Sequence, residues 1–226
     1  ICALVGVLVE LVAYRPVRRK GTSMSALITA IAMSLLLENL AQAIPAMGPN
    51  PRVISDEIFS TAPMSLGGVS VNMAAVITIV IAAVVMAALQ IFVQKTKLGR
   101  AMRAVSENKE ASTLVGINVN RTIVTTFAIG SGLAAIAALM YCAQYHTVTT
   151  TMGSMLGLKA FVAAVMGGIG LIPGAMLGGI VVGIIEALVT AYISSSLANA
   201  VVFLILIVML LVKPAGILGK NVGEKV

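Results

Sequence analysis

A run of 23 residues without a charged side chain, 71–93, restricts the fold of this chain more than any other feature. As an α-helix this run is about 35 Å long, enough to cross a hydrocarbon core of about 30 Å with some tilt. The whole sequence is 59% hydrophobic and 10% charged, whereas soluble domains are nearer half apolar. We therefore predict an all-α fold, a polytopic transmembrane helical bundle.

Further apolar stretches predict more crossings, about seven in all. Lys and Arg concentrate on the cytoplasmic side of membrane proteins, which sets the orientation. Four positive charges follow the first stretch in a predicted loop at 14–20, and the polar segment 95–121 holds six basic residues against two acidic ones, so both are expected inside. The segment 47–69, rich in Pro, Gly and Ser, is then a periplasmic loop with room for a short hairpin. The predicted crossings are 1–13, 26–46, 71–93, 122–143, 158–166, 174–192 and 197–212.

The stretch 158–174 leaves two interpretations open. Its apolar part is too short for a full span and runs into a Gly-rich segment, which is typical of a broken span or a re-entrant piece. A crossing places 13 of the 15 basic residues on the cytoplasmic side and leaves Arg52 and Lys159 outside. We therefore predict that it crosses, that the preceding turn covers 144–157, and that the C-terminus with Lys213, Lys220 and Lys225 is cytoplasmic.

The polar segment 95–121 contains a predicted helix of about nine residues. Ser106 can cap its start, Glu107 and Glu110 then lie in the first turn near the positive end of the dipole, and Gly116 can end it in a left-handed conformation. A helix this short is marginal in water, so some contact must hold it. It packs on its own membrane domain or docks onto a separate cytoplasmic protein. One face is apolar, with Ala111, Leu114 and Val115 at i, i+3 and i+4.

Glu110-Ala111-Ser112, three further residues and Gly116 resemble the E-A-A-x-x-x-G motif by which permeases of ABC importers engage their ATPase subunits. Ser112 stands where the general motif has its second Ala. The chain resembles branched-chain amino acid permeases of the LivH type over essentially its whole length. The other stretches that carry this resemblance are 14–18 (YRPVR), 96–106 (TKLGRAMRAVS), 166–174 (MGGIGLIPG) and 214–219 (PAGILG).

This resemblance implies a single permease domain over 1–226, in the inner membrane of a bacterium, that moves branched-chain or similar hydrophobic amino acids. It implies as partners a second related permease subunit, two cytoplasmic ATP-binding subunits and a periplasmic substrate-binding protein, besides membrane lipid. Because Ile1 is not a start Met and lies in an apolar run, further N-terminal helices are expected. The implied coupling residues are Arg100, Arg103, Glu110, Ala111, Ser112 and Gly116.

The sequence does not indicate an enzyme, a cofactor or nucleic-acid binding. It has no P-loop and no nucleophile with a base beside it, so any ATP hydrolysis belongs to another subunit. One His, and two Cys in apolar runs, give no metal site and no disulfide framework. The net charge of +7 comes from clusters beside the spans, which topology and anionic lipid explain.

Glu10, Glu38 and Glu186 lie inside apolar runs, where ionisable side chains are costly and commonly functional. Glu10 is about one turn from Arg15, so pairing with it is the simplest explanation. Glu38 and Glu186 either hydrogen-bond between helices or face a translocation path. The candidate path residues are Ser34, Glu38 and Gln42, at i, i+4 and i+8, and Gly183, Glu186 and Thr190, which share a helix face with Gly179.

The Gly-rich run after 166 allows close helix contact or a partly unwound gate. The pairs Gly174/Gly178 and Gly179/Gly183 have the small-xxx-small spacing of packed membrane helices, and packing is the favoured interpretation. A gate near the translocation path is the alternative. The candidate hinge or gate residues are Gly167, Gly168, Gly170, Pro173 and Gly174.

Two other functions fit parts of the sequence. A secondary transporter or channel would use Glu38 or Glu186 as a proton or ion relay, but no inverted repeat is evident and the polar helix is left without a role. An ABC permease for urea or short amides would use the same machinery with another cargo. The sequence does not separate these cargoes.

Overall fold

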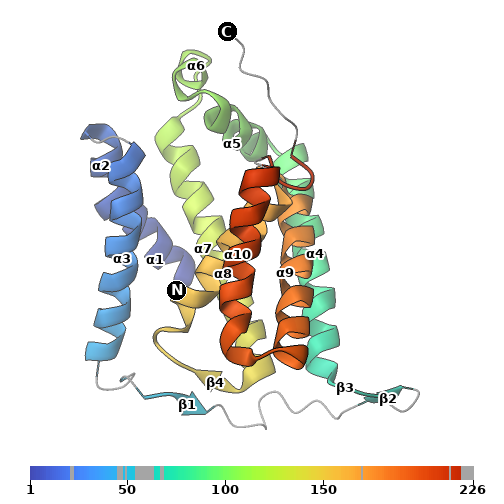
Figure 1. Ribbon diagram of the computed structural model, residues 1–226. Coiled ribbons are helices and arrows are strands. Elements are labelled where there is room, and N and C mark those ends of the chain that lie inside the picture. Colours follow the sequence, from blue (N-terminus) through green and yellow to red (C-terminus); the bar gives the residue numbers. More distant parts are fainter. Residues whose placement is uncertain are drawn as a thin grey trace. The chain divides into compact units, whose positions relative to one another are not determined.

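The computed structural model of the chain divides into two compact units, Ile1–Thr151 and Met152–Val226 (Figure 1). Nearly all described residues are helical, which confirms the predicted all-α class. The described strands are only two or three residues long and pair two by two. The described residues are 1–20, 23–44, 48, 50–53, 64–66, 69–168, 170–213 and 215–219.

The first unit begins with a helix that contains one π-helical stretch. α1 (Cys2–Val9) continues into η1 (Glu10–Tyr14) and then α2 (Arg15–Lys20). The Arg15 N–H donates to the Glu10 carbonyl five residues back, which is the hydrogen bond of a π turn. Pro16, which has no N–H, follows where the α-helical ladder is already interrupted. The predicted loop at 14–20 is therefore wrong, because the basic cluster is helical.

α3 (Ser23–Ala43) corresponds to the predicted span 26–46, whose last residues lie outside the described part. β1 (Arg52–Val53) pairs antiparallel with β4 (Thr147–Val148). β2 (Met64–Leu66) and β3 (Val69–Val71) form the short hairpin for which the sequence has room. The rest of the predicted loop 47–69 falls largely outside the described residues.

Two long apolar helices follow the predicted spans closely. α4 (Met73–Lys95) begins after Asn72, whose side chain accepts a hydrogen bond from the Ala74 N–H. α7 (Val119–Tyr145) begins after Asn118 and ends at His146, which has a φ of 52°. Between them the polar segment folds into α5 (Lys97–Glu107) and α6 (Lys109–Leu114). Within the first unit, α5 and α6 lie at one end of α7 and β4 at the other (Figure 1).

The first helix packs closely along α7. Gly6 of α1 is buried, and a Cβ there would collide with the Ser131 side chain. At the end of η1, the rings of Tyr14 and Phe127 are in contact, with centroids 5.0 Å apart and planes tilted by 52°. These contacts fix the N-terminal helix on the helix that emerges from the polar segment.

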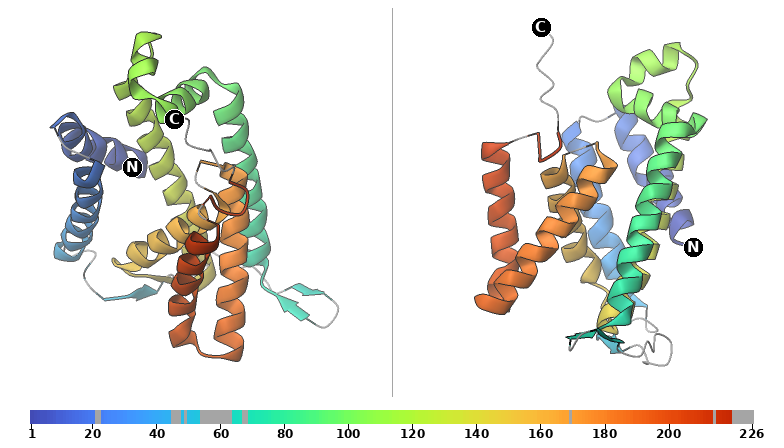
Figure 2. Two further views of the ribbon diagram at one scale, coloured as in Figure 1. Left: turned by 45° about the horizontal axis from the view of Figure 1, so that its top comes forward. Right: turned by 90° about the vertical axis from the view of Figure 1, so that its right-hand side faces the viewer.

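The second unit is a bundle of three helices, each antiparallel to the one before it (Figure 2). They are α8 (Met152–Gly167), α9 (Ile172–Tyr192) and α10 (Ser195–Val212). The predicted turn at 144–157 is wrong in extent, because α8 already begins at Met152. Gly153 and Gly157 lower helix propensity, and the packing of the apolar residues that follow outweighs this loss. The core consists of Val162, Ala163, Met166, Val182 and Val202.

Four helices of the described chain are long and apolar enough to cross a membrane: α4, α7, α9 and α10. Two shorter apolar stretches are Ile28–Ala43 and Met152–Gly167. The 16 residues of α8 span about 24 Å, less than a typical hydrocarbon core of about 30 Å. Large apolar side chains are exposed along these helices, Leu188 and Leu204 among them, as lipid contact requires. The chain is a multi-pass membrane protein, and the count of seven crossings stays a prediction.

Candidate functional site

The polar segment begins with a tight turn from α4 into α5. The Thr96 hydroxyl donates to the Phe92 carbonyl at 2.7 Å and accepts from the Gly99 N–H at 3.0 Å. A Cβ at Gly99 would collide with the Val93 backbone, so the turn has room for glycine alone without a shift of the chain. α5 is therefore held directly against the end of α4.

The N-cap of α6 is Asn108, and the prediction of Ser106 is wrong. The Asn108 Oδ1 accepts from the N–H groups of Glu110 and Ala111 at 2.9 and 3.0 Å. Asn108 has the extended backbone of a capping residue, whereas Ser106 is helical and donates to the Arg103 carbonyl within α5. Glu107 consequently ends α5 instead of starting α6. Glu110 does lie in the first turn of α6, which has six residues rather than nine.

The C-terminal end of α6 is closed by the predicted glycine. Gly116 has a φ of 85°. Its N–H donates to Thr113 O at 3.0 Å, and the Ile117 N–H donates to Ser112 O at 3.0 Å. These two bonds are the Schellman motif, which satisfies the last carbonyls of a helix. Side-chain and backbone caps thus hold both ends of this short helix.

The apolar stripe of α6 is uncovered. Leu114 and the C-cap residue Val115 are 90% and 81% exposed, and Ala111 is exposed as well. Ser112, on the other face, is buried and donates to the Asn108 carbonyl at 2.7 Å. No described residue of this unit packs over the stripe.

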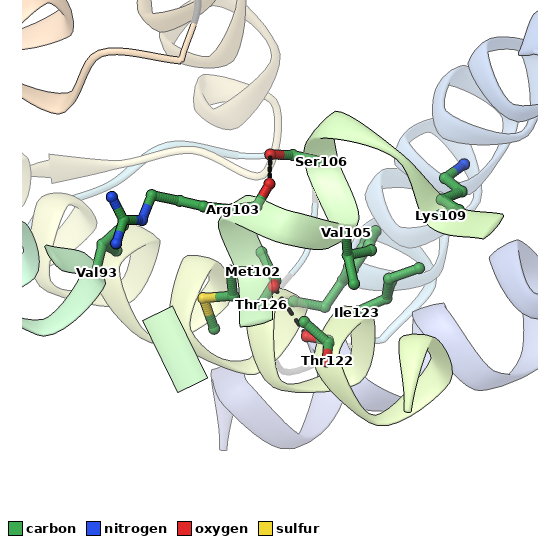
Figure 3. Close-up of a pocket in the computed structure, with 10 residues that line it drawn as sticks. Val93, Met102, Arg103, Val105, Ser106, Lys109, Thr122, Ile123 and Thr126 are labelled. Atoms are coloured by element: carbon green, nitrogen blue, oxygen red, sulfur yellow. Dashed lines mark hydrogen bonds between the residues drawn. The ribbon is translucent and has the colours of Figure 1, made fainter. Parts of the chain in front are cut away.

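A mostly apolar groove of about 420 Å³ lies beneath α5, between the end of α4 and the start of α7 (Figure 3). Met102 and Val105 of α5 face Ile123 and Thr126 of α7 there. Arg103 donates to the Gln94 carbonyl at 3.4 Å, and Arg100 is exposed. The groove is lined by Val93, Met102, Arg103, Val105, Ser106, Lys109, Thr122, Ile123, Thr126 and Phe127.

Glu10 and Glu186 each form an ion pair. Glu10 pairs with Arg18 at 2.9 Å, so the pairing prediction is confirmed in kind but wrong in its partner, Arg15. Glu186 of α9 pairs with Lys159 of α8 at 2.6 Å. Lys159 was missed as a site residue, although a lone basic residue within an apolar stretch was a signal for a partner of Glu186.

The candidate path residues divide between two helices. Glu38 and Gln42 on α3 are half-buried and Ser34 is exposed. On α9, Gly183 and Thr190 are exposed and Glu186 is half-buried. The opposite face of α9 is buried within its unit, through Gly174, Gly178, Val182 and Val189. The exposed face of α9 is therefore the one that carries the predicted path residues.

The candidate hinge residues form a close backbone contact. A Cβ at Gly167 would collide with the Gly174 backbone, and one at Gly178 with the Ala163 carbonyl oxygen. Gly168 and Gly170 have φ values of 111° and 91°, and Pro173 lies in the first turn of α9. After α10 the chain folds back over this turn, where the Ile217 N–H donates to Met166 O at 2.8 Å. This geometry favours close helix packing as the role of Gly174 and Gly178. At Gly183, no described atom lies within 4 Å of the position that a Cβ would take.

Comparison with known proteins identifies relatives along almost the whole chain. The profile of the family described as "Branched-chain amino acid transport system / permease component" matches residues 1–212. The high-affinity branched-chain amino acid transport system permease protein BraD of Pseudomonas aeruginosa is 39% identical over 229 residues, which cover 98% of this chain and 72% of BraD. LivH of Escherichia coli strain K12, of the same description, is 42% identical over 226 residues, 96% of this chain and 71% of LivH.

A shorter similarity extends to the xylose transport system permease protein XylH of Escherichia coli strain K12, 36% identical over 90 residues, which cover 37% of this chain and 23% of XylH. No solved structure matches the chain. All of these relatives are transport permeases rather than enzymes. On the extent of the family match and of the identity to BraD and LivH, this chain belongs to the family of branched-chain amino acid transport permease components.

Proposed function

We propose that this chain is the permease subunit of an ATP-driven ABC importer that moves branched-chain or similar hydrophobic amino acids across the bacterial inner membrane. The chain would assemble with a second related permease, two cytoplasmic ATP-binding subunits and a periplasmic substrate-binding protein. The observation that carries the proposal is the uncovered apolar stripe of α6, Ala111, Leu114 and Val115, on a polar segment between two spans.

The stripe is suited to docking for two physical reasons. Burial of apolar surface contributes about 25 cal/mol per Å², so two large exposed side chains favour association. The Asn108 cap and the Schellman turn at Gly116 already order the helix, so little conformational entropy is lost when a partner binds. Basic side chains at Arg100, Arg103 and Lys109 add a positive surface that suits an acidic partner groove.

A charged substitution on the apolar stripe tests this function. Val115→Lys should reduce co-purification of the ATP-binding subunit and uptake of radiolabelled leucine at least several-fold, while membrane insertion is retained. Val53→Lys is the matched control, because Val53 is 78% exposed and lies in β1, beyond the other end of α7. Equal co-purification of the ATP-binding subunit in both variants would refute the docking role.

The cargo is tested in the same reconstituted assembly. Leucine, isoleucine and valine should be taken up in an ATP-dependent manner, and urea and short amides should not compete with them. Uptake driven by an ion gradient without ATP would instead favour the secondary transporter.

The path across the membrane is proposed to include the exposed face of α9 with Gly183, Glu186 and Thr190, and the polar stripe Ser34, Glu38 and Gln42 of α3. A zwitterionic amino acid carries an ammonium and a carboxylate group, and the Glu186–Lys159 pair offers one opposite charge to each. Both side chains are partly exposed, 35% and 22%, so a substrate can reach them in the isolated chain.

The orientation proposed for the chain places α6 and the C-terminus in the cytoplasm. Lys220, Lys225 and Asn221 lie outside the described residues. With Cys2 and Cys142 replaced, a cysteine at Asn221 should resist impermeant thiol reagents in intact cells. Ready labelling would favour the re-entrant interpretation of 158–174.

A further inference from the structure

The ion pair between Glu10 and Arg18 is unusual in its spacing along one helix. In a regular α-helix, residues eight apart point about 80° away from each other. The π turn at Glu10–Tyr14 inserts one extra residue, so Arg18 takes the place of a seventh residue, about 20° from the direction of Glu10. The two side chains therefore meet on one face, with Arg18 Nη2 2.9 Å from Glu10 Oε1.

This ion pair is largely buried, where an unpaired charge is costly in free energy. The Glu10 side chain is 0% exposed and that of Arg18 is 23% exposed. The second carboxylate oxygen, Glu10 Oε2, is also buried and has no hydrogen-bond partner among the described residues. Arg18 is the cation in the described chain that compensates this buried negative charge, and the ion pair constrains the position of its side chain.

Arg18 also reaches the polar segment. The same Nη2 atom donates to Asn120 Oδ1 at 3.2 Å, across 102 residues of sequence. Asn120 lies in the first turn of α7, two residues after the Asn118 cap. From there the chain runs back to Gly116 and the Schellman turn of α6, with Ile117 bonded to Ser112. Residues 117–119 therefore separate the Arg18 contact at Asn120 from the Schellman turn that ends α6.

We propose that Glu10, Arg18 and Asn120 form a polar clamp that positions α6 relative to the N-terminal helix, so that motion of the docked helix is passed to α1 and α2. The clamp rests on the proposed importer function. Glu10 fixes Arg18, Arg18 holds Asn120, and Asn120 holds the start of α7. These residues are positioning residues, since none of them is part of the docking stripe.

The test separates coupling from folding by removing the hydrogen bond without leaving a buried charge alone. In the reconstituted importer, Asn120→Ala should lower leucine transported per ATP hydrolysed several-fold, while assembly and ATP hydrolysis stimulated by the binding protein persist. Asn120→Asp keeps an acceptor for Arg18 and should retain the wild-type ratio. Asn39→Ala is the matched control, because Asn39 is exposed on α3 and donates to Leu35 within its own helix.

The outcomes distinguish the clamp from the function on which it rests. A wild-type assembly without ATP-dependent leucine uptake would refute the importer function itself. A coupled wild type with an unchanged transport-to-ATP ratio in Asn120→Ala would overturn the clamp. A loss of uptake in Asn120→Ala in strict proportion to lost assembly would also overturn it, because a structural role alone predicts that result.

Discussion

Two reversals of chain direction in this molecule are stabilised in different ways. In the first unit, α6 is held by the Asn108 side chain at one end and by the left-handed Gly116 at the other. In the second unit, the reversal between α8 and α9 is closed by backbone against backbone, at Gly167, Gly174 and Gly178. The first arrangement leaves large apolar side chains exposed on α6, and the second leaves no room for side chains.

The difference between these two turns distinguishes apolar surface that stabilises the fold from apolar surface that is available to a partner. Where glycines bring two helices together, the role of the contact is structural, and substitutions are expected to change stability. Where caps order a helix that touches little of its own chain, the free face is available to a partner. The following predictions test this distinction.

The largest expected effect is at the glycine contact. Gly178→Ala places a methyl group against the Ala163 carbonyl oxygen and should lower the free energy of unfolding by about 1–3 kcal/mol. Gly183→Ala is the matched control on the same helix, because nothing lies within 4 Å of its Cβ position. The control should be neutral or slightly stabilising, since Ala has a higher helix propensity than Gly. Unfolding of the detergent-solubilised variants measures both, and equal stability would contradict close packing at Gly178.

The cap of α6 gives the next effect. Asn108→Ala removes an acceptor for two N–H groups and should cost about 1 kcal/mol of local stability. Ser106→Ala should change little, because Ser106 lies in α5 and bonds to Arg103 O there. Faster amide hydrogen exchange at 110–114 in Asn108→Ala, but not in Ser106→Ala, would be the expected readout. The reverse pattern would restore Ser106 as the cap.

The smallest effect on stability, but an informative one, is expected at Glu186. Glu186→Gln keeps a hydrogen-bond acceptor for Lys159 and should lower stability by less than about 1 kcal/mol. If Glu186 receives the ammonium group of the substrate, uptake at limiting leucine should fall several-fold while assembly and basal ATP hydrolysis remain. Wild-type uptake would leave Glu186 as a packing element.

The sequence predicted the long helices well because they are governed by a local property. An apolar run long enough to span a bilayer fixes α4 and α7 to within a few residues of 71–93 and 122–143. Gly116 was also predictable, since its place after a short amphipathic stretch favours a left-handed helix end. α5 was missed, although Leu98, Met102 and Val105 recur at i, i+4 and i+7 after Thr96.

The ion pairs and the choice of cap depended on features that the sequence pattern does not show. The π turn shifts every later residue of its helix by one position, which brings Arg18, eight residues on, to the face of Glu10. The Lys159–Glu186 pair depends on the crossing of α8 and α9, which the Gly178 contact determines. Ser106 and Asn108 are both good N-caps, and the extension of α5 to Glu107 decided between them.

The central claim, that the exposed stripe of α6 docks onto the ATP-binding subunit, is tested most directly by photo-crosslinking. A photoreactive amino acid at Leu114, which is 90% exposed, should cross-link to the ATP-binding subunit in the assembled importer, whereas the same probe at Val53 should not. Cross-links from Leu114 that stay within the permease, with no product containing the ATP-binding subunit, would contradict the claim.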